Sequence, residues 1–167
     1  WSYLFPVSDD GLNGLSDFMY NYARFADGRI DVMEVWNEYN NMSGPYKSDY
    51  SYEAKYHKAV YNGISRAAAD GIKGITVSGL DTDSWGLWGS NEVVSVLSKL
   101  NGEKVFDAVS LHPYHRKAYT DTAQNSAPET GVTKSLPLAI RDELTKYNQN
   151  SDIPIYFTES GWSDSFM

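Results

Sequence analysis

The 167-residue sequence predicts an α/β fold in which parallel β-strands alternate with α-helices. Four short runs are rich in β-branched and apolar residues, and the stretches between them carry apolar residues at helical spacing. Parallel neighbours need long crossovers, so this alternation indicates a parallel sheet. The loops after the predicted strands are long, whereas the turns before them are brief. This asymmetry favours part of a (β/α)₈ TIM barrel, whose sites lie at the carboxyl ends of its strands.

The predicted strands span residues 30–36, 74–80, 106–111 and 153–157. Helices are expected over residues 15–26, around residues 56–67, over 91–100 and over 136–147, because apolar residues recur there near the helical period. Ser16 lies near the start of the first of these helices, and Ser90 is the expected N-cap of the third. The expected order is therefore αβαβαβαβ.

The same pattern indicates the domain organisation. No glycine-rich phosphate loop follows any predicted strand, which argues against a nucleotide-binding doubly wound sheet. A complete (β/α)₈ barrel takes about 250 residues. We therefore expect residues 1–167 to form the central portion of a single barrel, a fragment that supplies four of its strands.

Composition excludes several classes of function. The formal net charge of −8 disfavours binding to nucleic acid or to anionic lipid. No cysteine is present, so neither disulfides nor thiolate metal sites are expected, and no apolar run approaches the roughly 20 residues of a membrane span. The 13 Tyr and 5 Trp suit contacts with sugar rings, although aromatic residues also fill cores.

Two glutamates follow predicted strands that are far apart in the sequence. Glu38 ends the first strand and Glu159 follows the last, so a parallel sheet would bring both to one edge. Cleavage of a glycosidic bond needs such a pair, one carboxyl group to protonate the leaving oxygen and one to attack or to activate water. Either glutamate alone would more simply be a solvated loop residue.

The sequences around these glutamates resemble a known clan. The three runs are Trp36-Asn37-Glu38, Leu111-His112-Pro113-Tyr114 and Thr158-Glu159-Ser160-Gly161-Trp162. In this order they look like the large clan of retaining glycoside hydrolases with (β/α)₈ barrels. The nearest motifs are those of family thirty-nine, which includes β-xylosidases and α-iduronidases, with the cellulase-type family five as a rival. Tyr39 stands where many relatives carry proline.

By this resemblance the four strands match barrel strands four to seven. It implies that Glu38 is the general acid/base, that Glu159 is the nucleophile, and that Asn37 holds the sugar 2-hydroxyl group. It also implies that Tyr114 orients the nucleophile and that His112 lines the same pocket. No cofactor and no metal is implied.

Elementary electrostatics agrees with these roles. Repulsion from the Glu159 carboxylate favours a proton on Glu38, and this repulsion disappears once Glu159 is glycosylated. Glu38 can then act as the base towards water, and the two carboxyl groups of such a retaining pair are expected about 5–5.5 Å apart.

Strand alternation makes two further predictions. It would send the neighbours Asn37 and Glu38 to opposite faces, so a bulge or a strong twist is expected at that strand end. Glu34 shares the parity of Glu38, and we expect it to be a buried structural partner rather than a third catalytic group.

Several tryptophans are candidates for stacking against a sugar. Trp162 follows the nucleophile motif, and Trp85 and Trp88 follow the second predicted strand. Ordinary packing of Trp85 and Trp88 is an equally open reading. The expected partner is a carbohydrate substrate.

A half-barrel would also expose two sheet edges, so the rest of the barrel or a second chain is expected to complete it. A barrel that binds sugar without cleaving it is the alternative function. Secretion or display at the cell surface is expected only because polysaccharides lie there.

Overall fold

The computed structural model describes residues 8–41, 49–83, 87, 91–113 and 132–160. Its helices are α1 (Asp9–Ala26), α2 (Tyr50–Ala69), α4 (Glu92–Leu100) and α5 (Val132–Lys146), and a 3₁₀ turn, η1, covers Tyr39–Asn41. Its strands are β1 (Val32–Glu34), β2 (Thr76–Asp83), β3 (Ala108–His112) and β4 (Ile155–Phe157). The predicted alternation of helix and strand is confirmed.

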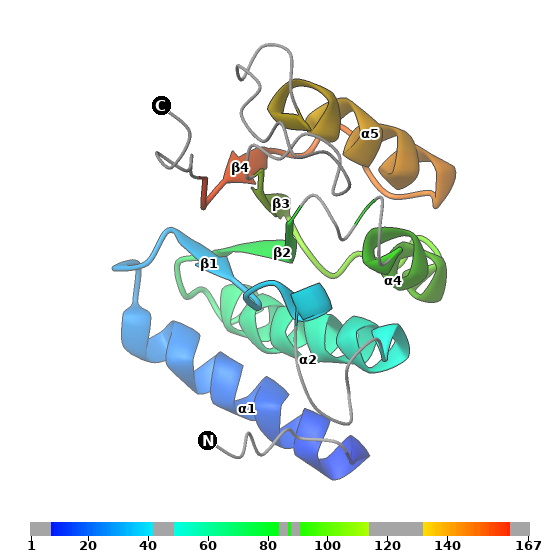
Figure 1. The fold of residues 1–167 in the computed structure, drawn as a ribbon. Coiled ribbons are helices and arrows are strands. Elements are labelled where there is room, and N and C mark those ends of the chain that lie inside the picture. The colour runs from blue at the N-terminus through cyan, green and yellow to red at the C-terminus, as the bar shows by residue number, and fades with distance from the viewer. Residues whose placement is uncertain (1–7, 42–48, 84–86, 88–90, 114–131, 161–167) are drawn as a thin grey trace.

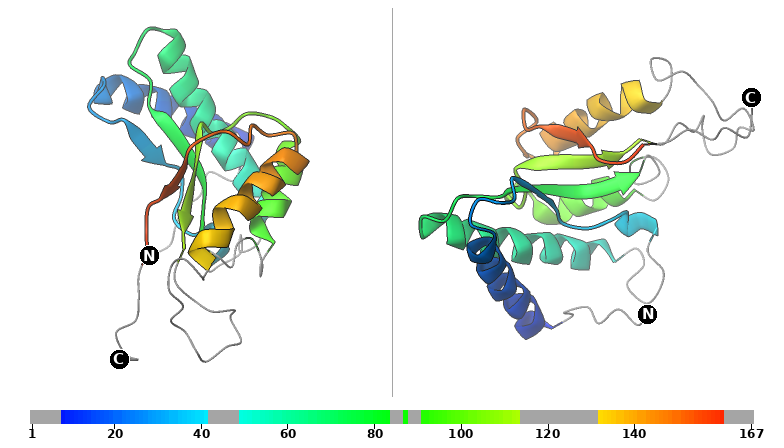
Figure 2. Two further views of the ribbon diagram at one scale, coloured as in Figure 1. Left: turned by 90° about the horizontal axis from the view of Figure 1, so that it is seen from above. Right: turned by 90° about the vertical axis from the view of Figure 1, so that its left-hand side faces the viewer.

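The four strands form one parallel sheet in the sequential order β1-β2-β3-β4. Helices α2, α4 and α5 follow the sheet in an arc, and α1 packs on the outer side of α2 (Figure 1). Two further views show the same succession along a twisted sheet (Figure 2). The α/β class with a parallel sheet is therefore confirmed.

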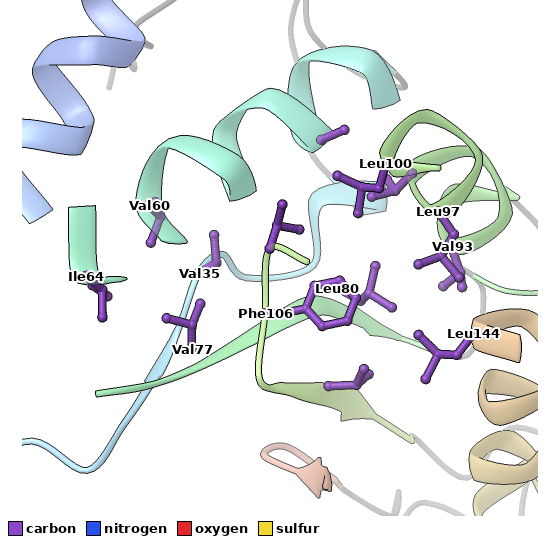
Figure 3. Packing of buried hydrophobic residues seen from close by; sticks show 14 of the residues in the cluster. Val35, Val60, Ile64, Val77, Leu80, Val93, Leu97, Leu100, Phe106 and Leu144 are labelled. Atoms are coloured by element: carbon purple, nitrogen blue, oxygen red, sulfur yellow. The ribbon is translucent and has the colours of Figure 1, made fainter. Parts of the chain in front are cut away.

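One hydrophobic core joins the sheet to its helices. Figure 3 shows Val60 and Ile64 of α2, Leu97 of α4 and Leu144 of α5 gathered around the strands. Val77 of β2 contributes a fully buried side chain to this core. Burial of apolar surface is the main driving force for such packing.

Polar side chains lie on the sheet between these core residues. Glu34 of β1 pairs with Ser78 of β2, and the hydroxyl groups of Ser78 and of Ser110 in β3 form a hydrogen bond. In a (β/α)₈ barrel these polar side chains would face the interior.

The starts of the helices differ from the prediction. Helix α1 begins at Asp9 rather than at residue 15, because Ser8 caps it by accepting a hydrogen bond from the Gly11 N–H group and two acidic residues occupy the first turn. At α4 the N-cap is Asn91 in a left-handed conformation, and Ser90 lies outside the described residues. Helix α2 begins at Tyr50, earlier than its apolar stripe indicated, after the cap Asp49.

Strand lengths differ as well. β1 is shorter than predicted, whereas β2 continues three residues past its predicted end, through Asp81 to Asp83. None of the helices in the described part of the chain is long and apolar enough to cross a membrane.

Candidate active site

The carboxyl ends of β1, β3 and β4 bring together the central residues predicted from sequence. Glu38 follows β1, His112 is the last residue of β3, and Glu159 follows β4. Asn37 lies beside Glu38 with an exposed side chain. The other predicted site residues, Tyr114, Trp85, Trp88 and Trp162, lie outside the described residues.

His112 occupies the centre of this cluster. Its ring is fully buried, with Nδ1 3.0 Å from Oε1 of Glu38 and Nε2 3.4 Å from Oε1 of Glu34. The same Nδ1 lies 3.9 Å from Oε2 of Glu159. A neutral imidazole carries one N–H group, so it cannot donate to Glu38 and Glu34 together. A proton on Glu38 satisfies both contacts, because Glu38 then donates to Nδ1 and Nε2 donates to Glu34.

The two predicted catalytic carboxyl groups lie close to each other. Glu38, His112 and Glu159 each offer one ligand atom, and these atoms all lie within 4.8 Å of one another. The side chain of Glu38 is 18% exposed and that of Glu159 is 44% exposed, so both can be reached from solvent. This spacing fits two carboxyl groups acting on one bond, and it also fits three ligands around one divalent cation.

Glu34 departs from its predicted role. We expected a buried structural partner, but its side chain is 32% exposed. It accepts a hydrogen bond from the Thr158 hydroxyl group and lies against Nε2 of His112. With these two contacts and an exposed fraction of 32%, Glu34 belongs to the site itself.

The bulge or twist expected at the end of β1 is not what places Asn37 and Glu38, because β1 ends at Glu34 and Glu38 follows with a positive φ of 46°. The bulge lies in the neighbouring strand, where the pairing of β2 with β3 shifts between Gly79 and Thr82. Within that shift Leu80 and Asp81 also have positive φ, 70° and 34°. Such conformations are strained for residues other than glycine and concentrate at functional sites.

Asp81 connects this bulge to the segment that carries Glu38. Its carboxylate accepts a hydrogen bond from the Trp36 N–H group at 2.8 Å, and its carbonyl accepts one from the Glu38 N–H group at 2.8 Å. Burial raises the pKa of Asp81 well above its usual value, and the bond from Trp36 opposes that rise. The bulge in β2 therefore sets the backbone position of the predicted acid/base.

His57 of α2 supports the bulge from the helix side. Its Nδ1 lies 2.9 Å from the carbonyl oxygen of Glu53, and its Nε2 accepts from the Leu80 N–H group at 3.2 Å. The ring is therefore neutral, with its proton on Nδ1. Complete burial lowers the pKa of His57 to about 4, which keeps it in this form.

A second layer of polar side chains lies behind Glu38. Asn41 donates to Oε2 of Glu38 at 2.8 Å and to Oδ2 of Asp83 at 3.3 Å. Asn40 donates to the other oxygen of Asp83 at 2.8 Å and lies 3.3 Å from the Thr82 hydroxyl group. Glu38 is thus connected to β2 through the η1 turn.

Two buried acids form the base of this layer. Thr82 Oγ1 lies 2.6 Å from Oε2 of Glu92, the first residue of α4, and Glu92 faces Glu53 of α2. Burial raises the pKa of Glu92 to about 7, and burial followed by the charge of Glu92 raises that of Glu53 well above its usual value. Neither oxygen of Glu53 has a hydrogen-bond partner when both acids are ionised, so a proton shared by the pair relieves both.

The supporting residues were not singled out from the sequence. Asp81 and Asp83 directly follow the second predicted strand, and Thr158 lies inside the quoted nucleophile motif, so position at a strand end was the available signal. Asn41 and Glu53 carried no comparable signal, because a helix and a turn bring them to the site.

The assembled site offers two neighbouring carboxyl groups, one imidazole between them and a shell of amides and acids that holds one carboxyl group. These groups can protonate a leaving group, attack an electrophilic carbon and activate water. No model of a known protein family and no curated protein matches this chain.

Proposed function

We propose that this chain carries the catalytic site of a retaining O-glycosidase on part of a (β/α)₈ barrel. The observation that carries the proposal is the approach of Glu38 and Glu159 from separate strand ends, with oxygens within 4.8 Å of each other. Retaining glycosidases hold their carboxyl groups at about 5–5.5 Å and inverting ones at about 6.5–9.5 Å. The close pair supports direct attack by one carboxylate, because the spacing is shorter than that of an inverting pair.

In the first step Glu159 attacks the anomeric carbon, and the bond from that carbon to the leaving oxygen breaks. Glu38 transfers its proton to the leaving oxygen, so the products are a glycosyl ester on Glu159 and a free alcohol. His112 supports this starting state, because Nδ1 can accept a hydrogen bond from protonated Glu38 while Nε2 donates to Glu34.

In the second step Glu38 is ionised and takes a proton from water, which attacks the glycosyl ester and releases Glu159. The charge that opposed ionisation of Glu38 is absent at this stage, so one residue serves as acid and then as base. Asn37, exposed beside Glu38, is suitably placed to donate to the sugar 2-hydroxyl group.

The sheet topology supports the barrel. Among the described strands the order runs without reversal, so this part of the sheet lacks the switch point at which doubly wound folds bind their ligands. The arc of helices in Figure 1 fits the outer layer of a barrel wall, and the hydrogen-bonded Ser78 and Ser110 fit its interior.

Both edges of this sheet support the need for additional strands. The exposed fraction is 43% for Val32 of β1 and 47% for Phe157 of β4, and these are the two outer strands. On α1, Phe18 and Phe25 are 62% and 74% exposed. We attribute these apolar surfaces to contacts with the rest of a barrel or with a second chain. A polysaccharide substrate would place the protein outside the cell.

The nucleophile is tested by azide rescue. In the full-length protein, Glu159→Ala should lose at least about 10³-fold in kcat on aryl glycosides, and azide should restore turnover by forming a glycosyl azide of inverted anomeric configuration. Glu38→Ala with azide should instead yield the retained configuration. Glu143→Ala on α5 is the control and should behave as wild type. Absence of glycosyl azide, or the same anomer from both variants, would contradict the assignment.

The geometry also favours a second candidate, a divalent cation held by Glu38, His112 and Glu159. Prolonged dialysis against EDTA separates the two functions. Double displacement predicts unchanged hydrolysis after removal of metal and inhibition by added Zn²⁺. A metal-dependent hydrolase predicts loss of activity that stoichiometric Zn²⁺ restores.

A further inference from the structure

The carboxyl group of Glu38 is held by one amide that also binds a second acid. Asn41 donates to Oε2 of Glu38 at 2.8 Å and to Oδ2 of Asp83 at 3.3 Å. A side-chain amide has two N–H groups, so it can satisfy both acceptors at once. The position of the Asn41 amide is therefore shared between the predicted acid/base and a residue at the end of β2.

Asp83 has the chemistry that this position requires. Its two carboxylate oxygens accept from two different amides, Oδ1 from Asn40 at 2.8 Å and Oδ2 from Asn41. An asparagine there would offer one oxygen and one NH₂ group, so one neighbouring amide would face a donor instead of an acceptor. Only a carboxylate satisfies both amides.

The other end of this chain of contacts is buried and well anchored. Asp83 is 8% exposed and Asn40 is 6% exposed, while Thr82 and Glu92 are fully buried. Asn40 lies between Asp83 and the Thr82 hydroxyl group, and that hydroxyl group contacts Glu92 at the start of α4. Displacement of Asp83 would therefore disturb a packed region, whereas Glu38 and Asn41 lie at its accessible end.

We infer that Asp83 is a positioning residue for the acid/base Glu38 and acts through the bridging amide of Asn41. The inference rests on the proposed function, because it assigns a role in the protonation of the leaving group. The described hydrogen bonds of the Asp83 carboxylate go to Asn40 and Asn41, so it reaches Glu38 through Asn41. It holds the Glu38 carboxyl group in the orientation from which a proton reaches the glycosidic oxygen.

This role has a specific kinetic signature. A poor leaving group departs only with a proton from Glu38, whereas dinitrophenolate departs without one. Misplacement of Glu38 should therefore slow poor substrates and spare activated ones. Loss of the fold, or a misplaced Glu159, would slow both kinds of substrate equally.

The test compares two substrates with Asp83→Asn in the full-length protein. The probes are the 2,4-dinitrophenyl and methyl forms of whichever β-xyloside, β-glucoside or β-cellobioside the wild type cleaves. We expect kcat/KM to fall about 10–50-fold on the methyl glycoside and less than about 3-fold on the dinitrophenyl glycoside. Asn41→Ala should reproduce this pattern, and an equal fall on both substrates, or no fall, would overturn the inference.

Asp107→Asn is the matched control. Asp107 also accepts at both oxygens, from Val77 N–H at 3.2 Å and from Lys104 at 2.8 Å, but it lies at the amino end of β3. Its substitution should change stability without any dependence on the leaving group.

A crystal structure of Asp83→Asn separates this inference from the proposed function. The structure should show the contact between Glu38 Oε2 and Asn41 Nδ2 broken, whether or not the protein cleaves glycosides. An intact contact would overturn the positioning role. Absence of turnover by the wild type on every probe, with the contact broken in the variant, would contradict the glycosidase alone.

Discussion

The amino and carboxyl ends of the sheet differ in the residues that adopt positive φ angles. At the amino end, brief turns lead from helix to strand, and their positive φ angles fall on residue types that tolerate them, such as Asp27 and Gly28 after α1 or Asn101 and Gly102 after α4. At the carboxyl end, positive φ falls on Glu38, Leu80 and Asp81. Leucine in particular has no local reason to adopt that conformation.

Charged groups differ between the two ends in the same way. The amino end carries exposed ion pairs, such as Lys73 with Asp31 at 3.0 Å. The carboxyl end buries the carboxyl groups of Asp81, Glu53 and Glu92, and burial raises the pKa of each. Strain and buried charge each destabilise the fold, and they coincide here with the predicted catalytic pair. The comparison indicates that the carboxyl end contains destabilising features at the place where Glu38 is positioned.

The largest effect on activity is expected from Glu38→Gln at the carboxyl end of the sheet. We expect kcat on alkyl glycosides to fall about 10³–10⁴-fold, because the proton donor is lost, while thermal stability stays equal or rises. Steady-state kinetics and thermal melts of the same preparation measure both. A loss of stability in parallel with activity would mean that Glu38 is structural.

Two glycine substitutions compare the ends directly. An alanine Cβ at Gly79, in the β2 bulge, would lie 2.9 Å from His57 and 3.0 Å from Phe106, so Gly79→Ala should cost about 3 kcal/mol and reduce activity. Gly71, in the turn before β2, has φ +86° and open space around it, so Gly71→Ala should cost only about 1 kcal/mol and spare activity. Urea unfolding and kinetics would measure both effects. Equal losses of unfolding free energy in the two variants would contradict the difference between the two ends.

The buried acid pair predicts a pH dependence. The folded pKa of Glu92 is about 7, above the ordinary value of 4.5, so its stabilising contribution is complete below about pH 4.5 and is lost as pH rises through 7. Glu92→Gln should remove this loss. The difference in unfolding free energy between the variant and wild type should therefore shift in favour of the variant by about 2 kcal/mol from pH 5 to pH 8. Glu103→Gln on the surface is the control.

His57 contributes the opposite slope. Its folded pKa of about 4 lies below the ordinary 6.5, so its contribution is complete above about pH 6.5 and is lost as pH falls through 4. Subtracting the unfolding free energies of wild type and Glu92→Gln at each pH cancels this contribution. A difference that does not change with pH would contradict the shift at Glu92.

The smallest effect is expected at the amino end. Asp31→Asn removes the ion pair with Lys73, whose side chains are 82% and 61% exposed. The free energy of unfolding should change by about 0.5 kcal/mol or less, since solvent screens such pairs. Chemical denaturation in low and high salt measures this change. A loss above about 1 kcal/mol in unfolding free energy would contradict the expectation that the amino end tolerates substitution.

The sequence by itself determined the alternating elements, the parallel sheet and the meeting of Glu38, His112 and Glu159 at one edge. These follow from local periodicity and from the geometry of parallel strands, which carries every strand end to the same side. The bulge that strict alternation predicted at the end of the first strand lies instead in β2, because β1 ends before Asn37 and Glu38.

Only the tertiary structure decided how that edge is held. The bulge at Leu80 is stabilised by His57 from a helix, the Glu38 carboxyl group is bound by Asn41 from a 3₁₀ turn, and Glu53 meets Glu92 across two helix starts. Glu34 of β1 meets His112 of β3 and Thr158, which follows β4. Each of these features depends on contacts between residues that are distant in the sequence or on the packing of whole elements. Local sequence patterns do not predict such contacts.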